Sequence, residues 1–144
     1  MDESIPHLSE LSGEECFRLL ATADVGRVAV NLPGGHAPLI RPVNYVFHER
    51  AVVFRSARGS KFTFLTLTNQ ASFEIDGIDS SDHTGWSVIV VGLAEEVTNA
   101  AEVTNLERSG LRPWAPGDKP HWIRIRPEVV SGRRIGRQAA PRHD

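Results

Sequence analysis

The residues best suited to chemistry lie in one short basic segment, RSARGSK at positions 55–61. It follows a run of β-forming residues and precedes a predicted helix, and Gly59 lets the backbone approach a ligand closely. Because the N-terminus of a helix attracts anions, this segment could hold a phosphate group. The side chains that would contribute are Arg55, Ser56, Arg58, Ser60 and Lys61. An ordinary basic loop is the alternative, and the missing first glycine of a G-x-x-x-x-G-K loop disfavours hydrolysis of nucleoside triphosphates.

A second candidate surface lies where prolines interrupt the β-forming run at residues 37–48. Neither Pro38 nor Pro42 can donate a hydrogen bond to a neighbouring strand, so the strand near Pro42 is predicted to be an edge, bent or bulged. Its main-chain groups then become available to a planar ligand that lies against the sheet. The residues concerned are Arg41, Pro42, Val43, Asn44 and Tyr45. An edge strand that proline protects from aggregation explains the pattern equally well.

The tryptophans Trp86, Trp114 and Trp122 each suit a core or an interface as well as a ligand site. Trp122 shares one strand face with Arg124 and Arg126 by alternation, which favours a phosphate-bearing aromatic ligand or, alternatively, a charged outer face. The C-terminal arginines could also meet the acidic first helix across a dimer. Nucleic acid is a weaker alternative, because no aromatic RNA-binding signature accompanies them.

Composition excludes several other classes of function. The chain of 144 residues has sixteen basic and eighteen acidic residues. Its net charge of −2 excludes a uniformly basic nucleic-acid binder. Cys16 is the single cysteine and is predicted to be a buried, inert thiol, and the six histidines are scattered, so no metal site is predicted. No G-x-S-x-G segment occurs and no catalytic acid or base stands out. The sequence shows no signal peptide or membrane span, so we expect a cytoplasmic protein.

The pattern of elements predicts one domain over residues 1–144 with a core at about 10–135. A polar lead-in (1–11), a polar loop (77–85), a fixed proline-rich loop (111–120) and a frayed tail (137–144) connect or flank the elements. Predicted helices follow the Ser12 capping box, cover 62–67 and cover 99–108. Predicted strands cover 25–31, 37–48, 51–55, 71–76, 86–98 and 121–135, and Gly92 marks a bulge or bend. Six closely spaced strands favour an antiparallel barrel with helices packed on it.

Taken in order, six segments resemble the pyridoxamine 5'-phosphate oxidase-like flavoproteins of the split-barrel fold. The segments are VGRVAV, PLIRPVNYVF, AVVFRSARGSKF, ASFEID, GWSVIVVGLAEEV and HWIRIRPEVVSGRRI. The resemblance implies a mainly β, six-stranded antiparallel split barrel with short peripheral helices, which forms a homodimer with two FMN molecules at the subunit interface. It implies that the Arg41–Tyr45 backbone lies along the isoalloxazine ring and that Arg55, Ser56, Ser60 and Lys61 hold the phosphate. Trp86 and Ser87 would lie close to the ring, and Trp122 and Arg124 would come from the second subunit.

The same resemblance implies an FMN-dependent oxidoreductase of unidentified substrate, in which the flavin exchanges a hydride or electrons with NAD(P)H or a small-molecule acceptor. The deazaflavin F420 is the alternative cofactor. The chain is shorter than a true pyridoxamine phosphate oxidase and lacks matches to its substrate contacts, so vitamin B6 oxidation is not expected. A non-enzymatic module that binds or senses flavin, F420 or haem is the rival function, because a fold alone does not choose among activities.

Overall fold

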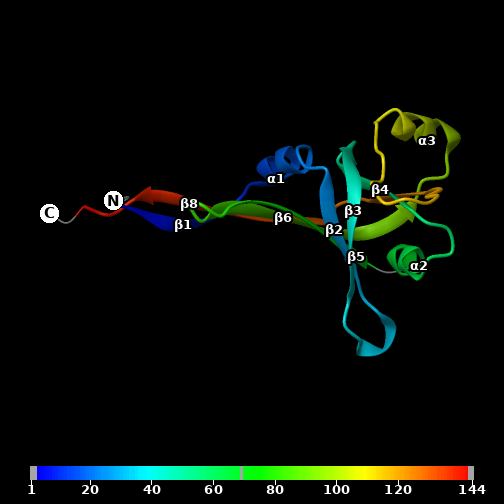
Figure 1. Cartoon of the computed structure of the whole chain (residues 1–144), viewed down its shortest axis with the longest axis horizontal. Helices are drawn as coiled ribbons and strands as arrows, with labels where there is room; N and C mark the ends of the chain where they lie inside the picture. Colours follow the sequence, from blue (N-terminus) through cyan, green and yellow to red (C-terminus); the bar gives the residue numbers. More distant parts are fainter. Residues whose placement is uncertain (1–2, 69, 143–144) are drawn as a thin grey trace.

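The computed structural model describes residues 3–68 and 70–142, in which six of eight strands form a β-barrel and three α-helices pack around it (Figure 1). The barrel strands are β2 (Val25–Val30), β3 (Leu39–His48), β4 (Ala51–Ser56), β5 (Gln70–Asp79), β6 (Thr84–Glu96) and β7 (His121–Ile125). They pair antiparallel in the order β5-β2-β3-β4-β7-β6, and β6 pairs again with β5 to close the barrel. The predicted six-stranded antiparallel barrel is therefore confirmed.

Two further strands lie outside the barrel and form an arm. β8 (Val129–Ala139) pairs with the first half of β6, and β1 (Ser4–Glu10) pairs with β8 along its whole length. We use "the arm" for β1, β8 and the β5–β6 hairpin beside them. Figure 1 shows the arm projecting from the barrel, with both ends of the chain at its tip.

Local sequence signals position the helices as expected. α1 (Gly13–Leu20) begins after Ser12, whose hydroxyl accepts a hydrogen bond from the Glu15 N–H at 3.2 Å, and α3 (Ala100–Glu107) begins after the capping residue Asn99. These side chains satisfy N–H groups that have no acceptor within the helix. α2 (Lys61–Thr68) follows β4 directly, as the sequence predicts. A short 3₁₀ turn, Pro33–Gly35, joins β2 to β3.

The structure corrects four predicted boundaries. The lead-in is strand β1, although residues 1–2 of the prediction lie outside the described part. The predicted loop at 77–85 shrinks to residues 80–83, because β5 and β6 extend into the arm. The predicted tail is strand up to Ala139, and its residues 143–144 are likewise not described. The predicted strand 121–135 is divided into β7 and β8.

These differences have two physical causes. In β1 no residue is fully buried, so no alternation of apolar and polar residues marks it as a strand. Its hydrogen bonds to β8 form it instead, with Ser4 opposite Ala139 and Glu10 opposite Arg133. Pro127 divides the last predicted strand, since proline cannot donate to a ladder.

Pro42 and Gly92 both mark special positions in the barrel. β3 pairs with β2 from residue 39 to residue 44, whereas its pairing with β4 begins only at Tyr45, so Pro42 lies on the edge segment that its sequence predicts. At Gly92, β6 exchanges its partner β8 for β7. A Cβ on Gly92 would lie 2.1 Å from the carbonyl oxygen of Arg126, so only glycine permits this close approach.

Apolar side chains fill the barrel and also cover part of its outside. Phe54, Phe73 and Ile75 are fully buried in the interior. Val53 and Trp122 point to the other side, where they pack with residues of α3 and the adjoining loops. β4 is therefore buried on both faces, which explains its nearly continuous run of apolar residues.

Tyr45 links the barrel to α1 and provides a test of the fold. Its side chain is buried, and its hydroxyl donates a 2.6 Å hydrogen bond to the Leu20 carbonyl oxygen. Burial, with a smaller contribution from the charge of Asp24, raises the pKa of Tyr45 above its ordinary value. The neutral hydroxyl thus stabilises the fold below the unfolded-state pKa of about 10, and this contribution is lost as the pH rises further.

We expect Tyr45→Phe to lower the free energy of unfolding by about 1–2 kcal/mol at neutral pH, because the Leu20 carbonyl loses its donor. We also expect the variant to lose less stability than the wild type between about pH 8 and pH 11, since it has no phenol to ionise. Urea denaturation at neutral pH measures the first effect, and urea denaturation at about pH 8 and about pH 11 measures the second. An equal alkaline loss in the two proteins would show that Tyr45 does not cause it.

Within the described residues, the helices are all too short or too polar to cross a membrane. The same residues contain no group of three or more His, Cys, Asp or Glu side chains arranged to hold a metal ion. Cys16 is fully buried, and burial raises the pKa of its thiol.

Candidate functional site

The N-terminus of α2 offers a site for an anion. Ser60 caps the helix, because its hydroxyl accepts a hydrogen bond from the Thr63 N–H at 2.9 Å. The first helical hydrogen bond runs from the Phe64 N–H to the Ser60 carbonyl, so the Lys61 and Phe62 N–H groups precede it and have no acceptor within the helix. Lys61 is exposed, and Gly59 has φ +69° with open space where a Cβ would lie. Free amides, a cation and an open approach together suit a phosphate group.

The hydroxyl groups of this segment fix its shape. Ser56 is buried at the end of β4, and its hydroxyl bonds to that of Thr63. Thr63 also donates to the Ala57 carbonyl at 2.9 Å and bonds to the Ser60 hydroxyl. Sequence reasoning missed Thr63, because a threonine three residues after Ser60 lacks the Glu or Gln that marks a capping box. These contacts hold the turn that presents Lys61.

Arg55 contacts a different part of the chain. Its Nε donates to the Lys119 carbonyl at 3.0 Å, and its guanidinium lies 4.8 Å from the centre of the Trp122 ring. Arg55 and Trp122 are directly opposite each other on β4 and β7. The structure thus brings two predicted site residues together on the outer face of the barrel, with Trp122 only 4% exposed.

The proline-bearing edge of β3 is open on one side. Arg41 and Pro42 are exposed, Val43 packs against the core, and Tyr45 points into it. Asn44 faces outward, and its Oδ1 accepts a 2.8 Å hydrogen bond from the Trp114 N–H. A planar molecule could therefore approach this edge from the side that lacks a strand.

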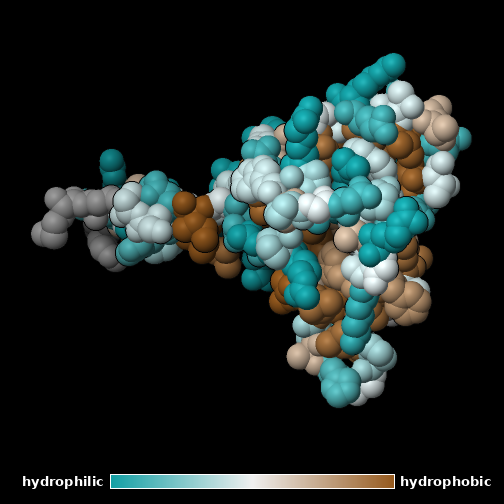
Figure 2. All heavy atoms as spheres, turned by 45° about the vertical axis from the view of Figure 1, so that its right-hand side comes forward, coloured by the Kyte–Doolittle hydropathy of each residue, from teal (hydrophilic) through white to brown (hydrophobic). Residues whose placement is uncertain are grey.

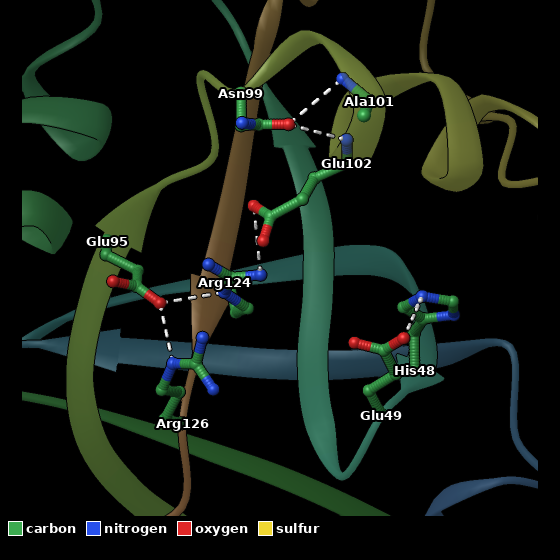
Figure 3. A network of polar contacts seen from close by, with 8 residues as sticks. All are labelled: His48, Glu49, Glu95, Asn99, Ala101, Glu102, Arg124 and Arg126. Atoms are coloured by element: carbon green, nitrogen blue, oxygen red, sulfur yellow. Dashed lines mark hydrogen bonds and ion pairs between the residues drawn. The ribbon is translucent and has the colours of Figure 1, made fainter.

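Arg124 belongs to a network of charged side chains shown in Figure 3. Its Nε lies 2.7 Å from Glu95 Oε1, and its Nη1 lies 3.5 Å from Glu102 Oε2. Arg126 Nε also lies 2.7 Å from Glu95 Oε1, and hydrogen bonds from Arg126 and Arg124 lower the pKa of the Glu95 carboxyl. Arg124 would have to exchange these carboxylates for a ligand phosphate. Its assignment to a cofactor of the second subunit, like that of Trp122, stays a prediction.

Trp86 and Ser87 line a cleft of about 720 Å³ on the arm. The Trp86 ring packs directly against Gly77 on the neighbouring strand β5. Only glycine leaves room for it, because a Cβ on Gly77 would lie 2.7 Å from ring atoms. The other lining residues include Leu8, Ile78, Arg133 and Ile135, whereas Pro42 and Lys61 do not line this cleft. Within one chain, Trp86 and Ser87 therefore line a surface that Pro42 and Lys61 do not share.

The family model for pyridoxamine 5'-phosphate oxidase matches residues 12–134. The chain belongs to this family. Within the pyridoxamine 5'-phosphate oxidase family, it is 34% identical over 138 residues to an uncharacterized protein of Mycobacterium tuberculosis, which covers 92% of this chain and 89% of that relative. The predicted family resemblance is confirmed.

Solved structures of similar chains support the same placement in the pyridoxamine 5'-phosphate oxidase family. The FAD-binding protein from Mycobacterium smegmatis is 35% identical, with a TM-score of 0.76 over 88% of this chain and 98% of that chain. A FAD-binding protein from Mesorhizobium loti is 26% identical, with a TM-score of 0.71 over 88% of this chain and 97% of that chain.

Proposed function

We propose that this chain is a flavin-dependent oxidoreductase. The observation that carries the proposal is the 35% identity to the Mycobacterium smegmatis FAD-binding protein over nearly the whole chain, within a shared family. A bound flavin supplies hydride or electron transfer, while the protein supplies binding, orientation and exclusion of water. NAD(P)H or another small molecule is the proposed partner in that transfer.

The residues of this chain fit such a cofactor. The free N–H groups at the start of α2 and the exposed Lys61 would bind a flavin phosphate, and Arg58 adds a second exposed cation nearby. The open edge of β3 at Arg41–Asn44 would lie along the isoalloxazine ring. Ser56 would act by holding the turn, since its hydroxyl is bonded to Thr63.

The choice of flavin nucleotide is part of the proposal. The family resemblance implies FMN, with F420 as the alternative, whereas the similar proteins from Mycobacterium smegmatis and Mesorhizobium loti are FAD-binding proteins. These similarities favour FAD as a second natural candidate. Both nucleotides carry the ring and the first phosphate that β3 and α2 would contact, so the same site suits either.

A second copy of the chain completes the proposed site. Ile78 is 74% exposed and Leu8 is 58% exposed, and both line the arm cleft beside Trp86. Figure 2 shows apolar residues at the surface of the arm where it meets the barrel. Exposed apolar side chains of this kind mark protein interfaces. We propose that the arms mediate a homodimer with a flavin at the subunit interface.

Purification followed by release of the bound molecule, with its mass and absorption spectrum, tests the proposal. Released FMN, FAD or F420 identifies the cofactor, and a haem spectrum would overturn flavin as the native ligand. Bleaching of the yellow colour by NADPH, followed by recovery with an acceptor, supports an oxidoreductase. Stable colour without turnover supports the rival, a non-enzymatic binding module, which the description of the similar proteins as FAD-binding also favours.

A further inference from the structure

The proline-rich loop at residues 111–120 is fastened to the outer face of the barrel at two points. The backbone N–H of Trp114 donates a hydrogen bond to Asn44 Oδ1 at 2.8 Å, and the backbone carbonyl of Lys119 accepts one from Arg55 Nε at 3.0 Å. The fastened residues are 70 and 64 positions apart in the sequence, respectively. The loop therefore has a fixed place over β3 and β4 instead of extending freely from the barrel.

The barrel residues that hold this loop lie next to one another on adjacent strands. Arg55 pairs with Trp122 across β4 and β7. Asn44 precedes Tyr45, which pairs with Phe54, the residue before Arg55. Since Tyr45 and Phe54 point into the core, Asn44 and Arg55 point outward together. Asn44, Arg55 and Trp122 therefore lie on the outer face of the adjacent strands β3, β4 and β7.

Trp114 is exposed even though its backbone is held. The residue is 75% exposed, while Leu111 in the same loop is buried under α3. The loop contains Pro113, Pro116 and Pro120, and proline restricts its backbone further. An exposed indole on a backbone that is held in place leaves a large apolar surface without a partner within the described chain.

We propose that the Trp114 side chain lines the flavin site and packs against the flavin ring, and that Asn44 positions Trp114. The inference rests on the proposed function, because it takes the β3 edge to be the place where the ring lies. The same residue, Asn44, belongs to that edge and holds the Trp114 backbone. A planar aromatic ligand matches an exposed indole because aromatic rings stack favourably. Asn44 acts here as a positioning residue through the loop.

Fluorescence of flavin bound to the full-length protein tests this contact, because an indole packed against a flavin quenches its emission. We expect Trp114→Leu to increase the emission and the lifetime of bound FMN and FAD, and to raise their Kd roughly twofold to tenfold. If the leucine variant does not fold, Trp114→Phe tests the emission alone, which should increase, because phenylalanine can still stack on the ring but lacks the quenching indole. Leu93→Ala, which changes an exposed apolar residue of β6, should leave both measurements unchanged.

The role of Asn44 is tested by two substitutions. Asn44→Ala removes the acceptor and should shift the emission of bound flavin toward that of Trp114→Leu, whereas Asn44→Asp keeps an acceptor oxygen and should stay near the wild type. Unchanged emission and Kd in the Trp114 variants overturn the inference while leaving flavin binding intact. A wild-type protein that takes up neither FMN nor FAD overturns the proposed function, and this inference with it.

Discussion

Lys61→Ala is expected to raise the Kd for the flavin nucleotide roughly tenfold to hundredfold, the effect of removing one charged donor from a phosphate. The fold should persist, because Lys61 is exposed at the first position of α2 and the Ser60 cap remains. Fluorescence titration of the cofactor-free protein measures the change. The difference from wild type should shrink as salt is added, since salt screens exposed charges.

Two variants separate the role of Lys61 from a general effect of charge. Lys61→Arg keeps the cation and should retain most of the affinity. Arg108→Ala removes an equally charged, exposed side chain at the end of α3 and should leave the Kd unchanged. Wild-type affinity in the Lys61→Ala variant would remove Lys61 from the phosphate site.

Ile78→Glu is expected to convert the dimer into a monomer, with the dimer dissociation constant rising about a hundredfold or more. The physical reason is that the proposed interface would bury a carboxylate without a partner. The folded chain should tolerate the change, because Ile78 is 74% exposed in it. Sedimentation equilibrium measures the mass, and each chain contributes 15.9 kDa. Because the proposed site needs both subunits, the monomer should also release its flavin.

Ala101→Glu is the matched control for Ile78→Glu. It adds the same charge at an exposed position of α3, which lies at the opposite end of the molecule from the arm (Figure 1). This variant should remain dimeric and keep its flavin. An Ile78→Glu protein that stays dimeric would place the interface elsewhere, and a wild-type monomer with flavin bound would contradict a shared site.

The sequence alone determined the features that depend on neighbouring residues. Ser12 and Asn99 begin their helices because a capping side chain reaches only the next turn. Pro42 marks an edge because its ring removes a donor wherever the strand lies. Lys61 stands at the start of α2 because the side chain of Ser60, the residue before it, caps the helix. The family resemblance and the six barrel strands came from such local patterns taken in order.

Only the tertiary structure decided what depends on residues far apart in the chain. β1 exists because β8 supplies its hydrogen bonds, and its own pattern of exposure carries no signal. Arg55 turns toward Lys119 and Trp122, and Asn44 holds Trp114, through contacts that span more than sixty positions of sequence. Spacing along one strand shows which face a side chain takes, whereas its partner depends on which loop folds over that face. The fold therefore brings Trp114 to β3, and this placement cannot be read from either segment alone.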